Sequence, residues 1–394
     1  MSPLRSGLTR LLTDERHLIQ GRKVGLVVNP TAVDESYRHL VDLLMEAEDV
    51  KVIRLFGPEH GVWGAAQDME HVTGEVDTHS QIPVVSLYGH SELTLRPRPE
   101  HLEGLDTLIY DIQDIGSRYY TFVYTLAFCM EEAARHGLRV VVCDRPNPLT
   151  GHHVEGGVLD MGWRSFVGRY PLPVRHGLTT GELALFFRDF HGLDDLDLRV
   201  VRVEGWRRSA WFDSTGLPWI NPSPNMPTLD TALVYPGMCL VEGTNLSEGR
   251  GTTRPFEWLG APWVDPWALA EALTAENLPG VVWRPLWFKP TFQKHAHKLC
   301  GGVQPHITNR SRFPALLAGV ALLKHCKRLF PEFDWRTEPY EFVSDRLAID
   351  LLGGGPELRQ QIEEGWDLAA FTQSWEPSRA SFEGERRRWL LYPD

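Results

Sequence analysis

Apolar runs and helical stretches alternate along the first third of the chain. Five runs rich in Val, Ile and Leu stand out, "KVGLVV", "VKVIRL", "IPVVSL", "LDTLIY" and "LRVVVC". Between them, "SYRHLVDLLMEAED" and "VYTLAFCMEEAARHG" have the character of helices, and in the first of these the apolar residues recur at helical spacing. Strands that are apolar on both faces and separated by helices predict a parallel sheet with both faces covered.

Polar residues follow each of the five runs. They are Asn29 and Thr31; Glu59 and His60; Tyr88 and His90; Asp111, Gln113, Asp114 and Arg118; and Asp144, Arg145 and Asn147. Turns commonly contain Asp, Asn and Gly, so one such end is ordinary. Because the carboxyl ends of parallel strands meet at one edge, five polar ends together predict a binding or catalytic site there.

The second half of the chain differs in composition. "PWINPSPNMPTLDTALVYPG" contains five prolines, which predicts a rigid, extended junction between domains near Leu229 to Tyr235. We therefore expect a catalytic α/β domain over residues 1–230 and a smaller α+β domain over residues 231–394. The polar, glycine-rich "VEGTNLSEGRGTT" follows the junction, and we expect it to face the polar edge of the sheet. Glu182, in the first turn of a predicted helix capped by Thr179 or Thr180, is expected to be a surface acid.

Composition narrows the possible partners. The chain has 394 residues, 42% of them hydrophobic and 23% charged, which is typical of a globular protein with sizeable cores. Its net charge is -12, and no Lys/Arg run would serve as a phosphate-binding stripe, so we expect neither nucleic acid nor anionic membrane as a main partner. No apolar stretch suggests an export signal or a membrane span, which predicts a cytoplasmic location unless a signal was removed.

Sequence motifs for common cofactors and metals are missing. No GxGxxG follows the first strand and no GxxxxGK[ST] occurs, so we expect no dinucleotide or nucleotide cofactor. The five cysteines are widely spaced without CxxC, and Cys143 lies in an apolar run, so the sequence predicts neither disulfides nor a zinc site. His152 and His153 are adjacent and are expected to lie in a solvated loop.

Several long segments resemble a known bacterial family. "FGPEHGVWG", "YDIQDIGSRYYTFVYTL", "DRPNPLTG", "EGTNLSEGRGTTRPFEWLGAPW" and "PTFQKHAHKLCGGVQPHI" are similar to segments of the exo-β-N-acetylmuramidase (NamZ-type) family, and the resemblance covers nearly the whole chain. It implies a Rossmann-like catalytic domain, a smaller auxiliary domain and an active site between them. It also implies release of N-acetylmuramic acid from the non-reducing ends of peptidoglycan fragments, with Glu59 as catalytic residue.

Glycoside hydrolysis needs an acid for the leaving oxygen and a second group on the other face of the sugar. We expect Glu59 to be the acid, and His60 either orients it or caps the turn. The second group is Asp111, Asp114 or Asp144, or else the 2-acetamido group of the substrate itself. The sequence leaves retaining, inverting and substrate-assisted routes open.

Substrate contacts are expected from further residues of the same segments. A guanidinium suits the lactyl carboxylate of muramic acid, and Arg118, Arg145 and Arg250 are the candidates, with Arg118 first because Tyr119 and Tyr120 beside it offer sugar-stacking faces. Each arginine could instead form a structural ion pair. The remaining expected substrate-binding residues are Asn29, Gln113, Tyr119, Asp144, Asn147, Glu242 and Glu248.

Two other functions fit parts of the pattern. A metal-dependent hydrolase or phosphatase could use Asp111, Asp114 and Asp144, although the spacing of the first two is not that of phosphoryl-transfer enzymes. A non-catalytic sugar-binding protein could be built on the same cleft. The oligomeric state is not indicated by the sequence.

Overall fold

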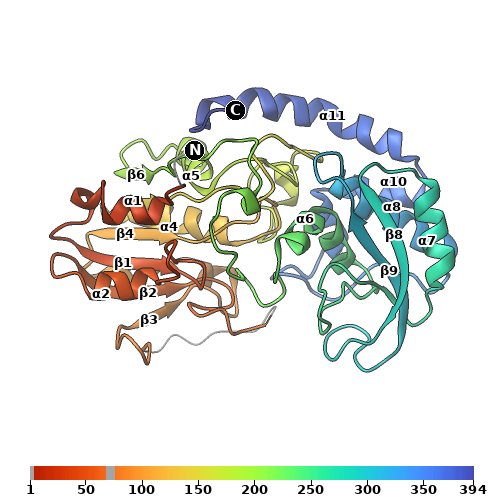
Figure 1. The fold of residues 1–394 in the computed structure, drawn as a ribbon, viewed down its shortest axis with the longest axis horizontal. Helices are drawn as coiled ribbons and strands as arrows, with labels where there is room; N and C mark the ends of the chain where they lie inside the picture. Colours follow the sequence, from red (N-terminus) through yellow and green to blue (C-terminus); the bar gives the residue numbers. More distant parts are fainter. Residues whose placement is uncertain (1–3, 68–75) are drawn as a thin grey trace.

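The computed structural model describes residues 4–67 and 76–394, which form two units side by side, each with its own sheet (Figure 1). The first unit holds a six-stranded parallel sheet in the order β3-β2-β1-β4-β5-β6, in which each strand pairs in parallel with its neighbours. Its strands are β1 Lys23–Val28, β2 Lys51–Gly57, β3 Val84–Ser86, β4 Thr107–Asp111, β5 Arg139–Cys143 and β6 Leu198–Val201. The five predicted strands are therefore present, and β6 adds a sixth at one edge.

Helices connect these strands. They are α1 Gly7–Leu12, α2 Leu40–Met45, α3 Pro99–Leu102, α4 Phe122–His136 and α5 Thr180–His191. Strands β1 and β4 are almost completely buried because helices and loops cover both faces of the sheet. From β1 the chain adds strands outward on one side, and from β4 it adds them on the other, so the direction of strand addition reverses between β1 and β4. In such sheets, ligands bind outside the carboxyl ends of the strands at this point.

The second unit is smaller and contains a three-stranded antiparallel sheet in the order β7-β9-β8. Its elements are α6 Leu229–Met238, β7 Leu259–Ala261, α7 Pro266–Ala275, β8 Val281–Phe288, β9 Cys300–Ile307, α8 Ala315–Leu329, α9 Ala348–Gly353, α10 Glu357–Glu363 and α11 Leu368–Glu385. The expected architecture, a parallel α/β domain followed by a smaller α+β domain, is confirmed.

The junction differs from the prediction. Residues Leu229–Met238 form helix α6, not an extended segment. The prolines of this region stand mostly before the helix, and the Thr228 side chain caps it by accepting from the Thr231 N–H. Gly237 lies against α8 so closely that a Cβ there would overlap the Ala315 carbonyl, so the two helices pack backbone to backbone.

The chain returns to the first unit at its C-terminal end. Helix α11 runs along one side of the molecule, from the second unit back to the first, where the two termini lie near each other (Figure 1). The Arg386 guanidinium then donates to the carbonyls of Gly151 at 3.0 Å and of His176 and Gly177 at 3.2 Å each. Leu391 donates its backbone N–H to Glu182 at 2.8 Å.

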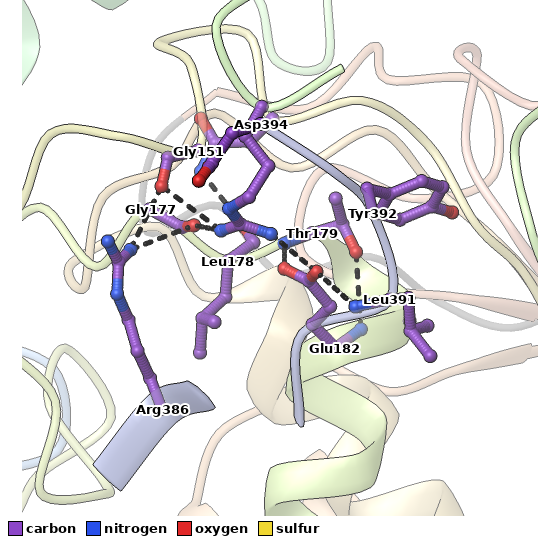
Figure 2. Close-up of polar contacts among 12 residues, drawn as sticks. Gly151, Gly177, Leu178, Thr179, Glu182, Arg386, Leu391, Tyr392 and Asp394 are labelled. Atoms are coloured by element: carbon purple, nitrogen blue, oxygen red, sulfur yellow. Dashed lines mark hydrogen bonds and ion pairs between the residues drawn. The ribbon is translucent and has the colours of Figure 1, made fainter. Parts of the chain in front are cut away.

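Glu182 is consequently not the surface acid that the helix pattern predicted. Its side chain is fully buried and pairs with Arg208 at 2.6 Å, and it also accepts from the Thr179 N–H in a capping box (Figure 2). Thr179 is the N-cap of α5. The helix start was predicted correctly, but the sequence does not show that residues 386–392 cover it.

The structure also shows the surroundings of the cysteines and of the adjacent His152 and His153. The five cysteines are free and buried, as expected for Cys143. His153 is half-buried and packs near Trp211, whereas His152 is more exposed. Over residues 4–67 and 76–394, no group of three or more His, Cys, Asp or Glu side chains is arranged to hold a metal ion. Within the same ranges, no helix combines the length and the apolar character that a membrane span requires.

Candidate active site

A cavity of about 490 Å³, counting its open mouth, lies between the two units. The first unit contributes Glu59, His60, Tyr119, Tyr120, Thr121, Phe122, Val167, Ser223, Asn225 and Met226 to its lining; the second contributes Tyr235, Glu242, Arg250, Phe256, Tyr340 and Glu341. We call this the inner cavity. Its walls carry both aromatic and charged side chains, a mixture that is typical of sites for small polar molecules.

The Glu59 turn is shaped by the end of β2. Gly61 donates its N–H to the Pro58 carbonyl at 2.9 Å, and His60 and Gly61 both have positive φ, 69° and 80°. A side chain on Gly57 would lie 2.8 Å from the Val62 nitrogen, so only glycine lets the chain fold back this tightly. Strain at His60 of this kind is typical of functional sites. The turn places Glu59 in the inner cavity with 7% of its surface exposed.

Glu59 and His60 have different partners. Glu59 Oε2 accepts a 2.8 Å hydrogen bond from Thr121 Oγ1. His60 Nδ1 lies 2.9 Å from the carbonyl oxygen of Ala66, and its ring meets Phe122 edge-on. Of the two roles considered for His60, its recorded contact therefore favours closing the turn, while its ring still lines the cavity.

The second unit supplies a charged wall. Arg250 Nη2 donates to Glu242 Oε1 at 2.7 Å, and Arg250 Nε lies 3.4 Å from Glu248 Oε1. Lys294 Nζ lies 3.1 Å from Glu248 Oε2, and Tyr340 donates to Glu242 Oε2 at 2.5 Å. Burial would raise the pKa of Glu248, but Lys294 and Arg250 outweigh it and hold that pKa below its ordinary value. The segment "VEGTNLSEGRGTT" thus contributes two residues to the cavity, Glu242 and Arg250, with Glu248 behind them.

Aromatic rings close the inner cavity on another side. Tyr119 and Tyr120 both meet Tyr235 edge-on, at 6.4 and 5.8 Å between ring centres, and Tyr235 meets Phe256 at 4.8 Å. Such packing holds the rings rigidly. The hydroxyl of Tyr119 is buried and has no hydrogen-bond partner within the described part of the chain. Apolar faces with buried hydroxyls suit a sugar ring.

Arg118, the first candidate for the substrate carboxylate, lies outside the inner cavity. It is fully buried, and its guanidinium donates to the carbonyls of Leu172 at 3.0 Å and Leu352 at 2.7 Å. Its position therefore argues for a structural role that joins the two units, because burial leaves no surface for a substrate. Tyr119, the residue after it, does face the cavity.

Most strand-end residues form a layer of buried contacts outside the lining of the inner cavity. Arg145 forms a two-bonded ion pair with Asp111, at 2.5 and 2.8 Å. Burial would lower the pKa of Arg145, but the Asp111 carboxylate outweighs burial and raises it. Asp144 accepts from Gly181 N at 2.7 Å and from the hydroxyls of Thr179 and Tyr392. These three residues hold loops in place and are not available to a substrate.

The other strand-end residues behave in the same way. Asn29 donates to the Pro222 carbonyl, Gln113 to the Asp114 and Pro146 carbonyls, and Asn147 to the Leu178 carbonyl. Asp114 accepts from Gly116 N at 2.7 Å, and its other oxygen, Oδ1, is buried without a partner among the described residues. Asp111, Asp114 and Asp144 are therefore separately engaged and do not gather into the ligand set that a metal-dependent hydrolase would need.

Several lining residues were not among the sequence candidates. Thr121 directly follows Arg118, Tyr119 and Tyr120, which the sequence did suggest as substrate contacts, but it was not itself a candidate. Ser223 and Asn225 come from the proline-rich segment, where closely spaced prolines could have pointed to a rigid binding loop. Glu341 lies in "EPYEFVS", which carries no recognisable motif.

Two family models match this chain. The N-terminal model of exo-beta-N-acetylmuramidase NamZ matches residues 24–230, and the C-terminal model matches residues 233–392. The chain belongs to the NamZ family of exo-β-N-acetylmuramidases. The resemblance of the five sequence segments is thereby confirmed, and NamZ-family membership makes the chain a glycoside hydrolase.

Relatives of this NamZ-family chain support the assignment over its whole length. The peptidoglycan beta-N-acetylmuramidase NamZ of Bacillus subtilis is 43% identical over 389 residues, which are 99% of this chain and 91% of that protein. Two crystal structures of DUF1343 family proteins from Bacteroides fragilis are similar over 100% of both chains. One has a TM-score of 0.87 at 33% identity, and the other a TM-score of 0.75 at 28% identity.

Proposed function

We propose that this chain releases N-acetylmuramic acid from the non-reducing ends of peptidoglycan-derived saccharides, with Glu59 acting directly on the glycosidic bond. The observation that carries the assignment is the position of Glu59. It stands at the end of β2, faces the inner cavity, and is held by Thr121 from the start of α4. It is also the glutamate of the "PEHG" turn through which the sequence resembles the family.

In this proposal Glu59 donates a proton to the glycosidic oxygen as the bond between that oxygen and C1 of the sugar breaks. A water molecule supplies the new oxygen at C1, and the proton it loses restores the acid. The second group comes from Glu341, which also lines the inner cavity, or from the 2-acetamido group of the substrate. Glu242 is less suitable because Arg250 and Tyr340 occupy both of its oxygens.

The cation for the lactyl carboxylate is reassigned to Arg250. Its guanidinium lines the inner cavity, whereas Arg118 is enclosed by backbone carbonyls. Arg250 and Lys294 together match the charges of Glu242 and Glu248, so this group is neutral as a whole. A carboxylate can therefore approach Arg250 without joining an excess of negative charge. The rings of Tyr119, Tyr120 and Tyr235 close one side of the inner cavity, which supports exo action.

Turnover of a chromogenic N-acetylmuraminide tests the assignment. Glu59→Gln should lower kcat by about 10²- to 10⁴-fold, as the loss of a general acid does, and leave the thermal unfolding midpoint nearly unchanged. Glu103→Gln is the matched control, because Glu103 is exposed and remote from the cavity lining. Near-normal turnover in folded Glu59→Gln would refute the role of Glu59.

The same assay separates the two other functions. A sugar-binding protein would retain the glycoside without releasing its chromophore. A metal-dependent hydrolase would lose turnover after treatment with a chelator and regain it when the metal is returned.

A further inference from the structure

A second cavity lies against the inner one. It has a volume of about 490 Å³, counting its open mouth, and we call it the outer cavity. Its lining includes Glu92, Arg164, Phe166, Arg169, Glu341 and Phe342. Glu341 lines both cavities, and the consecutive residues Phe166 and Val167 line the outer and the inner cavity respectively. The two cavities are therefore divided by a thin wall built from both units.

A tight hairpin forms part of that wall. Tyr340 and Val343 exchange two backbone hydrogen bonds of 2.9 Å, and Glu341 and Phe342 between them have positive φ, 45° and 68°. This conformation is costly for residues other than Gly, Asn or Asp, so the surrounding packing must hold it. Glu341 is tied to the first unit because Tyr88 donates to its Oε2 at 3.3 Å. The hairpin is thus fixed across the boundary between the units.

The outer cavity has an aromatic floor. Phe342 lies 5.8 Å from Tyr88 and 5.9 Å from Phe166, measured between ring centres. Phe342 nevertheless keeps 37% of its surface exposed, although two buried rings are beside it. An exposed ring held in a strained backbone conformation offers a rigid apolar face, which suits the carbon-bound hydrogens of a sugar ring.

Two guanidinium groups, of Arg164 and Arg169, and two carboxyl groups, of Glu92 and Glu341, line the outer cavity. Arg169 pairs with Glu92 at 2.8 Å, so its charge is largely matched. Arg164 is exposed, and its side chain forms no hydrogen bond or ion pair within the described part of the chain. The Arg164 guanidinium is thus the charged group of this lining that is exposed and without a partner among the described residues, and its planar donors can receive a carboxylate.

We propose that the outer cavity is the leaving-group subsite, which binds the saccharide that remains after the terminal sugar is released. This rests on the proposed function, because it assumes that the terminal sugar occupies the inner cavity. The wall between the cavities, with Glu341 in it, then lies beside the bond that is cleaved. Phe342 meets the first sugar of the leaving group, and Arg164 meets the lactyl carboxylate of the next muramyl residue.

Two substrates of different length test this proposal. The disaccharide muramyl-glucosamine ends before the second lactyl carboxylate, whereas the tetrasaccharide made of two such units contains it. In wild type the tetrasaccharide should have the higher kcat/KM. The ratio that matters is kcat/KM on the tetrasaccharide divided by kcat/KM on the disaccharide. Arg164→Ala should lower this ratio about two- to fivefold, which is the effect of losing an exposed charge pair. Arg164→Glu should lower it further.

A chemical control identifies the group that Arg164 recognises. When the inner lactyl carboxylate of the tetrasaccharide is converted to a neutral amide, the ratio should no longer depend on residue 164. Arg312→Ala is the matched protein control, because Arg312 is also exposed, lacks recorded side-chain contacts and lies in the second unit away from both cavities. It should leave the ratio unchanged.

Two results would overturn the subsite, namely an unchanged ratio in both Arg164 variants or an equal dependence on residue 164 for the neutral amide. If wild type cleaves neither saccharide, the proposed function fails instead. Calorimetric binding of the intact tetrasaccharide then decides the subsite separately. Weaker binding by Arg164→Glu than by Arg312→Ala supports it, and equal binding refutes it.

Discussion

Thr121 Oγ1 donates a 2.8 Å hydrogen bond to Glu59 Oε2, across 62 residues of sequence. Thr121 is the N-cap residue of α4, where a threonine hydroxyl ordinarily accepts from the helix backbone. Here the side chain makes no capping bond and holds the catalytic candidate instead. The start of α4 and the end of β2 are thereby joined at Glu59.

Removing this hydrogen bond should slow catalysis without unfolding the protein. Thr121→Val keeps the shape of the side chain but loses the donor, and we expect kcat to fall about tenfold, in line with roughly 1.5 kcal/mol for a hydrogen bond to a charged group. Thr121→Ser should retain most of the wild-type kcat. Steady-state assays of both variants on the muraminide check this, and a Val variant as active as the Ser variant would contradict it.

Arg250 should determine the preference for muramic over glucosamine sugars. A charge-assisted contact with the lactyl carboxylate is worth about 1.5–3 kcal/mol, which is roughly a ten- to hundredfold preference. Arg250→Lys keeps the charges of Glu242 and Glu248 balanced but loses the planar fork, so the preference should shrink and not vanish. The measurement is kcat/KM on the matched muraminide and glucosaminide. An equal loss on both sugars would place the carboxylate at another residue.

Asp144 should make stability depend on pH. Burial raises its pKa to about 6 from 3.8, even though Tyr392, Gly181 and Thr179 donate to it. The folded state therefore binds more protons than the unfolded state between these values, and its stability falls as pH rises from about 4 to 6. The change is on the order of 3 kcal/mol.

The Asp144→Asn variant isolates this contribution because asparagine does not titrate. Urea unfolding of both proteins between pH 4 and pH 7 gives the difference in free energy of unfolding. As pH rises, wild type should lose stability relative to the Asn variant, because only wild type has the Asp144 carboxyl group to deprotonate. A difference that stays constant over this range would show that Asp144 has an ordinary pKa.

Arg386 should be essential for the attachment of α11. Its guanidinium satisfies three buried carbonyls, and burial lowers its pKa to about 10. Arg386→Ala leaves the His176 carbonyl without this donor, whereas Arg208 still donates to the carbonyls of Gly151 and Gly177, and we expect a loss of about 1–3 kcal/mol in the free energy of unfolding. Arg387→Ala is the control, because Arg387 is exposed and its side chain forms no hydrogen bond or ion pair with residues that the structure describes. Urea titrations compare the two, and equal midpoints would contradict the prediction.

The parallel sheet was predictable because each of its first five strands is an apolar run in sequence. β6, "LRVV", is short, and only its last residue is fully buried, so the sequence does not mark it as a strand. The edge of the sheet that carries the site was also predictable, since polar residues follow every strand. The sequence does not show which of these polar residues face the cavity. Asp111 and Arg145 pair with each other, and Asp114 accepts from the backbone, so these three do not face it.

The cavity residues of the second unit are harder to predict from the sequence than those of the first. The sequence pointed to Glu242 and Arg250, which line the inner cavity, because they stand in a conspicuous loop. Glu341 was missed because its hairpin adopts left-handed conformations without Gly, Asn or Asp, the residues by which such turns are usually recognised. Contacts between residues far apart in sequence, such as Glu341 with Tyr88, decide its position and leave no local pattern.

The attachment of residues 386–392 to the first unit has a consequence for how the protein is made. A ribosome delivers the six-stranded sheet well before these residues emerge, so the nascent first unit holds Asp144 and Glu182 without Tyr392 and Leu391. The first unit therefore reaches its final packing only after the second has been synthesised. The inner cavity is likewise complete only when residues as far along the chain as Glu341 have been synthesised.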